Sequence, residues 1–188
     1  MNIALRRPLR LDEFLEWERH QELRYEFDGT QPVAMTGGTG AHSMIATNVV
    51  LALQRRLRRG RCRAFRGDLK ILVAGRVRYP DAVDTCSPVA DDADTVPDPV
   101  VVFEVLSSST AGTDRIEKNE EYRATASIQR YVMLEQTRQA ATVFSRVGDD
   151  WVGHVLIGCV SLAMPEIKAD LPLGDFYSGI EFADARLD

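Results

Sequence analysis

The chain has 188 residues, of which 45% are hydrophobic, and its 23 Lys and Arg stand against 28 Asp and Glu for a formal net charge of −5. This composition excludes an intrinsically disordered chain, and the acidic balance argues against a protein whose whole surface binds nucleic acid. The length predicts one domain over residues 1–188. The N-terminus lacks the apolar stretch of a signal peptide and no apolar run is long enough to span a membrane, so we expect a cytoplasmic protein with no membrane partner.

Hydrophobic periodicity predicts helices separated by groups of short strands. We expect a short amphipathic helix around 11–17, a long helix around 45–57 with a basic C-terminal end, and a polar-faced helix over 114–126. Asp28-Gly29 is a hairpin dipeptide between the first two strands. The expected strands are 24–27, 31–35, 62–65, 69–73, 77–79, 100–106, 131–134, 141–145 and 151–156. This order predicts a mixed α/β sheet.

The cysteines do not predict a metal site or a disulfide. Cys62, Cys86 and Cys159 lack the close spacing of a zinc site, and their odd number does not suggest a disulfide framework. We therefore expect small buried or half-buried thiols in a reducing compartment.

Glu104 is the most informative residue in the sequence. It is the one polar residue in the run from Val100 to Leu106, and so valine-rich a run predicts a strand buried on both faces. An ionised carboxylate buried without a partner costs several kcal/mol, so Glu104 needs a cation, a metal ion or a raised pKa. The alternative is that Glu104 lies at the end of the strand and pairs with an arginine.

Asp81 follows Tyr79-Pro80 at the end of an expected strand, where proline marks a strand terminus, an edge or a bulge. An acid at such a place is often only a turn former. Two acids on neighbouring strands can instead share Mg²⁺, which takes one or two carboxylates and keeps water. That arrangement indicates metal-assisted hydrolysis of a phosphodiester.

Asp114, Lys118 and Tyr122 are four residues apart and share one helical face. One interpretation is a surface ion pair between Asp114 and Lys118. The other is that Lys118 reaches the metal centre, where it orients water or neutralises the scissile phosphate. Ser107, with its neighbouring serines, has no accompanying base and is expected in the loop before this helix.

In this order the motifs resemble the Uma-two family of putative restriction endonucleases, in the PD-(D/E)xK nuclease superfamily. The motifs that carry the resemblance, over nearly the whole chain, are Arg24-Tyr25-Glu26, Gly29, Met35, His42, Asp68-Leu69-Lys70, Tyr79-Pro80-Asp81, Phe103-Glu104-Val105-Leu106-Ser107, Ser109-Thr110, Asp114-Arg115-x-Glu117-Lys118, Tyr122 and Gln129-x-Tyr131-Val132.

The resemblance implies a restriction-endonuclease-like fold, a central mixed β-sheet flanked by helices, and hydrolysis of DNA with Mg²⁺ or Mn²⁺. It implies Asp81 and Glu104 as metal ligands and Glu26 as a further acidic contributor. The superfamily places a lysine two residues after the second acid, where this chain has Leu106. The family supplies that charge from the following helix, which makes Lys118 the expected catalytic lysine. A homodimer is also expected, because cutting both strands takes two sites.

The contacts to nucleic acid are expected from basic residues. His42 is a phosphate or water contact at the family position, or a helix-terminal histidine satisfied by backbone groups. Lys70 contacts phosphate or is a solvated strand residue. Backbone contact is expected from an arginine-rich segment, in particular from Arg55 and Arg59, that consists of Arg55, Arg56, Arg58, Arg59, Arg61, Arg63 and Arg66.

A competing hypothesis is a non-catalytic protein that uses a degenerate nuclease fold to bind nucleic acid or a partner. The acidic net charge and the lysine missing from its usual place favour it, and a fold alone does not establish activity. Convergence of Asp81, Glu104 and Lys118 in the folded chain discriminates between the two. The sequence does not separate DNA from RNA, or double-stranded from single-stranded substrates.

Overall fold

The computed structural model describes residues 7–35, 37–107, 112 and 116–182. The elements are, in chain order, α1 (Leu11–Glu18), β1 (Tyr25–Phe27), β2 (Pro32–Ala34), α2 (Gly40–Leu57), β3 (Arg63–Arg66), β4 (Ile71–Val73), β5 (Arg76–Arg78), β6 (Ala82–Thr85), β7 (Pro99–Val105), α4 (Glu117–Ala124), β8 (Arg130–Leu134), β9 (Ala140–Val147), β10 (Asp150–Ile157), β11 (Ser161–Met164), the 3₁₀ helix η1 (Pro165–Ile167), β12 (Ala169–Pro172) and the 3₁₀ helix η2 (Leu173–Tyr177). Within these ranges no helix is long and apolar enough to cross a membrane.

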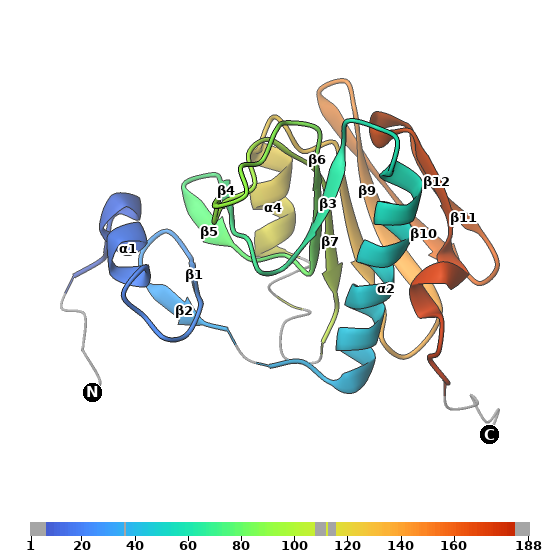
Figure 1. Ribbon diagram of the computed structural model, residues 1–188, viewed down its shortest axis with the longest axis horizontal. Coiled ribbons are helices and arrows are strands. Elements are labelled where there is room, and N and C mark those ends of the chain that lie inside the picture. The colour runs from blue at the N-terminus through green and yellow to red at the C-terminus, as the bar shows by residue number, and fades with distance from the viewer. Residues whose placement is uncertain (1–6, 36, 108–111, 113–115, 183–188) are drawn as a thin grey trace.

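A six-stranded mixed sheet forms the centre of the fold, in the order β10-β9-β8-β7-β6-β3. Strands β7 and β8 are parallel and are connected through α4, whereas the other neighbours are antiparallel. Helices α2 and α4 lie on opposite sides of this sheet (Figure 1). The prediction of a mixed α/β sheet flanked by helices is therefore confirmed.

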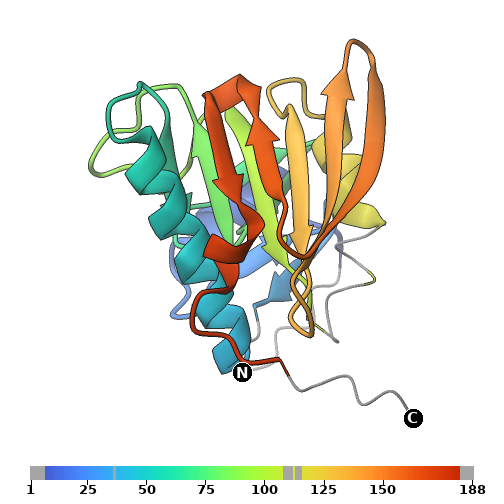
Figure 2. The ribbon, with the colours of Figure 1, turned by 90° about the vertical axis from the view of Figure 1, so that its right-hand side faces the viewer.

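The first face of the sheet is covered by α2, because its apolar residues recur every fourth position. Ile45, Val49 and Leu53 are fully buried and pack in one cluster with Val101 and Phe103 of β7. Complete burial of each such side chain contributes roughly 1.5–3 kcal/mol. The β11–β12 hairpin and η2 complete this layer beside α2 (Figure 2).

The second face is covered by α4 and by a smaller sheet in the order β2-β1-β5-β4. Tyr122 of α4 packs against Tyr131 of β8 with ring centroids 4.8 Å apart. Farther out, α1 places Phe14 on Phe27 of β1 at a centroid distance of 4.8 Å. Packing on this second face thus brings the early strands close to the end of the central sheet where Glu104 lies.

Two parts of the fold differ from the expectation. Asp81 follows the end of β5 as expected, but it also directly precedes β6, a strand that was not predicted; all four residues of β6 are buried, including Asp84. The C-terminal β11–β12 hairpin was also not predicted. Both are short strands whose residues mix apolar and polar types, so their pairing depends on neighbours that are distant in sequence.

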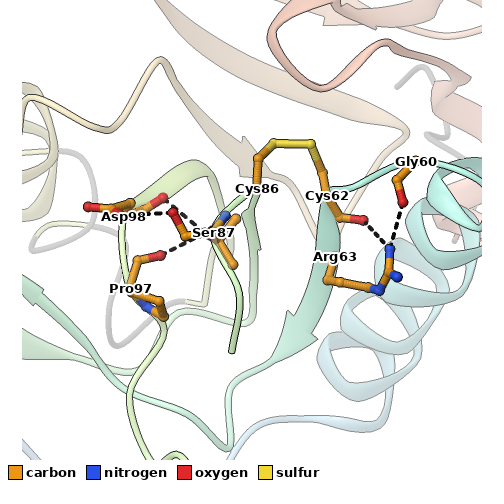
Figure 3. Close-up of a disulfide and its surroundings, with 8 residues drawn as sticks. Gly60, Cys62, Arg63, Cys86, Ser87, Pro97 and Asp98 are labelled. Atoms are coloured by element: carbon orange, nitrogen blue, oxygen red, sulfur yellow. Dashed lines mark hydrogen bonds between the residues drawn. A yellow bond between two sulfur atoms is a disulfide. The ribbon is translucent and has the colours of Figure 1, made fainter. Parts of the chain in front are cut away.

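The expectation of reduced cysteines is wrong for two of the three. Cys62 and Cys86 form a disulfide, and Cys159 is free and exposed. Strand β3 pairs with β6 in the register Arg63↔Thr85. Cys62 directly precedes β3 and Cys86 directly follows β6, so the two cysteines lie at the same end of this antiparallel pair (Figure 3). A separation of 24 residues hides a proximity that only the strand register creates.

Asp84 is buried in β6 without compensation. It is fully inaccessible, and neither carboxylate oxygen has a hydrogen-bond partner among the described residues. Burial, with a smaller contribution from the charge of Glu166, raises the pKa of Asp84 well above its ordinary value. The folded protein therefore favours the neutral acid, and the contribution of Asp84 to stability is lost as pH rises from about 4 through the folded pKa.

We expect Asp84→Asn to remove this loss. The free energy of unfolding of the variant should exceed that of the wild type by about 1 kcal/mol or more at pH 7.5, and the difference should shrink toward pH 4. Urea denaturation at about six pH values measures both free energies. Asp170→Asn, at an exposed position of β12, is the matched control and should change little. A variant that is less stable than the wild type at the higher pH would contradict this interpretation of Asp84.

Candidate active site

The register between β6 and β7 brings the two predicted metal ligands to one end of the sheet. Ala82 pairs with Phe103, so Asp81 and Glu104 are the next opposing positions of an antiparallel pair. Asp81 Oδ2 accepts a hydrogen bond of 2.7 Å from the backbone N–H of Val105. Asp81 is therefore fixed beside β7 and is more than a turn former.

Glu104 meets its partners from α4. Lys118 Nζ lies 3.0 Å from Glu104 Oε1, and the Tyr122 hydroxyl donates to the same oxygen at 2.8 Å. Lys118 is 6% exposed and Tyr122 is fully buried, so this helical face points into the core. Among the described residues, Glu104 thus has a lysine and a tyrosine as partners, and Lys118 is buried and not a surface residue. Asp114 lies outside the described residues.

Tyr122 serves Glu104 as a hydrogen-bond donor. Burial, and then the negative charge of Glu104, raise the pKa of Tyr122 well above its ordinary value. The phenol therefore keeps its proton at neutral pH and donates it in the hydrogen bond to Glu104.

Glu26 joins this group from β1. Its Oε1 lies 3.3 Å from Lys118 Nζ and accepts from the backbone N–H of Tyr79 at 3.2 Å. Lys118 thus lies between two carboxylates, those of Glu26 and Glu104. The residues suggested by the family resemblance converge here from β1, β7 and α4, which are far apart in sequence.

Arg78 and Glu121 belong to the same network and were not predicted. Arg78 donates to both oxygens of Glu121 at 2.7 Å and to Glu26 Oε2 at 3.1 Å, and both Arg78 and Glu121 are almost fully buried. Burial lowers the pKa of Arg78, but the hydrogen bonds to Glu121 and the charges of Glu26 and Glu121 outweigh it and hold the pKa above its ordinary value. Their positions in the sequence could have identified them, because Arg78 directly precedes Tyr79-Pro80-Asp81 and Glu121 directly precedes Tyr122.

His42 contacts the other side of Asp81. Thr39 caps the N-terminus of α2 and accepts from the backbone N–H of His42 at 3.1 Å, while the ring Nε2 lies 2.7 Å from Asp81 Oδ1. Capping therefore satisfies only the backbone of His42. His42 and Asp81 line a cleft of about 440 Å³ that also reaches Arg66 of β3.

The remaining predicted contacts lie elsewhere. Lys70 is 5% exposed and pairs with Glu18 at 2.8 Å and Asp94 at 3.1 Å, so its role is a structural ion pair and it is neither solvated nor open to phosphate. Arg55 and Arg59 lie at the C-terminal end of α2. That end is about 20 Å from His42 at 1.5 Å per residue.

The carboxylates of Asp81 and Glu104 are the kind of ligand that suits a hard divalent cation with few protein ligands. Among the described residues, no group of three or more His, Cys, Asp or Glu side chains is arranged to hold a metal ion. Mg²⁺ needs fewer protein ligands, because it usually binds through one or two carboxylates and keeps several waters. Asp81, directly before β6, and Glu104 of the neighbouring β7 are two carboxylates at adjacent positions.

Comparison with known proteins finds consistent similarities. Residues 11–167 match the family model Uma2, described as "Putative restriction endonuclease". An uncharacterized protein of Synechocystis is 30% identical over 91% of this chain and 92% of its own length, and a second is 25% identical over 84% and 93%. The crystal structure of a "putative nuclease" from Anabaena variabilis covers 91% of this chain and 98% of its own, with a TM-score of 0.73 at 20% identity.

We expect Lys118→Met to lower the free energy of unfolding by about 3–5 kcal/mol, because it leaves Glu104 and Glu26 buried with less compensating charge. Chemical denaturation measures this loss. In a double-mutant cycle with Glu104→Gln, the combined loss should be smaller than the sum of the two single losses. Lys168→Met, at an exposed position, is the matched control and should stay within about 0.5 kcal/mol. Additive losses in the cycle would show that the Lys118–Glu104 contact is not formed.

Proposed function

This chain belongs to the Uma2 family, described as "Putative restriction endonuclease", and we propose that it is a metal-dependent nuclease that hydrolyses phosphodiester bonds of DNA. The observation that carries the proposal is the convergence at one end of the central sheet. Asp81 and Glu104 are opposing neighbours there, and Lys118 lies 3.0 Å from Glu104. A buried carboxylate beside an exposed cleft has a better explanation in this chemistry than in stability alone.

Each residue of the proposed site has a separate task. Asp81 and Glu104 hold the Mg²⁺ or Mn²⁺, which when bound lowers the pKa of a coordinated water and neutralises charge on the phosphate. Lys118 keeps Glu104 oriented and provides positive charge where negative charge develops on the phosphate. Glu26 holds Lys118 in place from the side opposite to Glu104.

The position of the lysine supports this assignment. Leu106 occupies the place where the superfamily has its lysine, and Leu106 is 5% exposed within the core cluster of the second sheet face. Lys118 reaches the second acid from α4 instead. The missing lysine is therefore compensated in space, which weakens the hypothesis of a degenerate, non-catalytic fold.

One chain provides one such site, which cuts one strand of a duplex. We therefore propose that double-strand cleavage requires a homodimer. Nicking by the monomer and linearisation by the dimer give distinct plasmid products.

We expect the wild-type protein to cut or nick plasmid DNA with Mg²⁺ or Mn²⁺ and to be inactive in EDTA. Asp81→Asn and Glu104→Gln keep the shape of each side chain but remove the charge. Each should lower the cleavage rate by on the order of 100-fold or more, since loss of residues that merely orient metal ligands already costs 10–100-fold. A gel assay of plasmid conversion measures both effects.

Asp170→Asn is the control for a charge change away from the site and should cleave as the wild type does. Circular dichroism establishes that each variant is folded. A folded wild type that binds DNA but cuts neither duplex nor single strands with either metal would favour the non-catalytic binding protein.

A further inference from the structure

A groove runs along one side of α2, between that helix and β3. It has a volume of about 440 Å³ and is lined by Val50, Gln54 and Arg58 of the helix side and by Arg63 and Arg66 of β3. Strand β3 is the last strand of the six-stranded sheet, so the groove follows an open edge of the sheet. This surface lies on the outside of the fold and has no part in the buried network around Glu104.

The groove continues the cleft at the candidate active site. Arg66 lines both hollows. On α2, the cleft is lined by His42 and Ala46, and the groove is lined by Val50 and Gln54. These positions are four residues apart and form one row along the helix. The cleft and the groove therefore follow one another along α2, from Asp81 toward the C-terminal end of that helix.

The charge of the α2–β3 groove is positive, and no acidic side chain among the described residues lines it. Arg58, Arg63 and Arg66 are exposed, and none of the seven arginines between positions 55 and 66 forms an ion pair with a described residue. The chain has no acidic residue between Gln54 and Gly67. Such a segment on a protein with a net charge of −5 creates a local positive field that a polyanion would neutralise.

Arg63 is also held in position. Its Nη1 donates to the backbone carbonyls of Gly60 at 2.9 Å and Cys62 at 3.0 Å (Figure 3). The disulfide from Cys62 to Cys86 ties this point of the chain to the end of β6. A guanidinium fixed by backbone carbonyls loses less freedom when it contacts a phosphate.

We propose that this α2–β3 groove binds the phosphate backbone of duplex DNA on one side of the bond that is cut. The inference rests on the proposed nuclease function, because that function defines which end of the groove is the reactive one. From His42 to Arg58 the helix rises about 24 Å, at 1.5 Å per residue. That distance corresponds to about seven base steps at 3.4 Å per step. The substrate therefore extends by about seven base pairs from the cleavage position along α2.

The geometry separates the arginines into two groups. Arg58 and Arg63 line the α2–β3 groove, whereas Arg55 lines a hollow between α2 and η2, and Arg59 lines one beside the disulfide. The sequence suggested Arg55 and Arg59 as the backbone contacts. The groove assigns this role to Arg58, Arg63 and Arg66 instead.

The test compares two double variants of equal charge, Arg58→Ala/Arg63→Ala and Arg55→Ala/Arg59→Ala. Fluorescence anisotropy in EDTA measures binding to a labelled duplex of about 24 base pairs over a range of salt, so hydrolysis plays no part. We expect the Arg58/Arg63 variant to lose at least about tenfold in affinity. Its slope of log K against log salt should fall by about 2, since each lost phosphate contact removes about 0.9.

The Arg55/Arg59 variant should keep most of the affinity and the slope. Equal losses in the two double variants would overturn the groove assignment. Melting curves establish that both variants are folded. Binding is measured without metal, so the two proposals can fail separately. If Arg58→Ala/Arg63→Ala weakens binding but the wild type never cleaves DNA, the proposed function is refuted and the groove assignment stands. If the wild type cleaves DNA and this double variant cleaves it equally well, the groove assignment is refuted and the proposed function stands.

Discussion

The structure depends on the buried ion pair between Glu104 and Lys118 at the end of the central sheet. An isolated buried carboxylate would destabilise β7, so α4 must place a cation and a hydroxyl donor against it. Lys118 then needs Glu26, and Glu26 is in turn held by Arg78. The smaller sheet and α4 are thus joined to the central sheet through charge as well as through apolar packing.

Local pattern was enough to predict the centre of this network. A single acid in a valine-rich run indicated Glu104, and the four-residue spacing placed Lys118 and Tyr122 on one helical face. Both signals lie within a few residues of sequence. The long helix, the hairpin at Asp28-Gly29 and the strand around Glu104 were predicted for the same reason. The family resemblance added Glu26, which no local signal connects with α4.

Features that depend on strand register were out of reach of the sequence. Asp81 lies opposite Glu104 only because β6 pairs with β7 as it does, and Cys62 meets Cys86 only because β3 pairs with β6. The separation of the arginines into groove and non-groove positions likewise depends on which side of α2 faces β3. Lys70 shows the same limit, since its partner Glu18 is 52 residues away.

The central claim is that Asp81 and Glu104 together hold a divalent cation. Anomalous diffraction from crystals grown with Mn²⁺ tests it most directly, because the ion is located without reference to activity. We predict one strong peak between the two carboxylates, at about 2.1 Å from an oxygen of each, with Lys118 still beside Glu104. A map with no peak there at saturating Mn²⁺, or with peaks only at surface acids, would contradict the account.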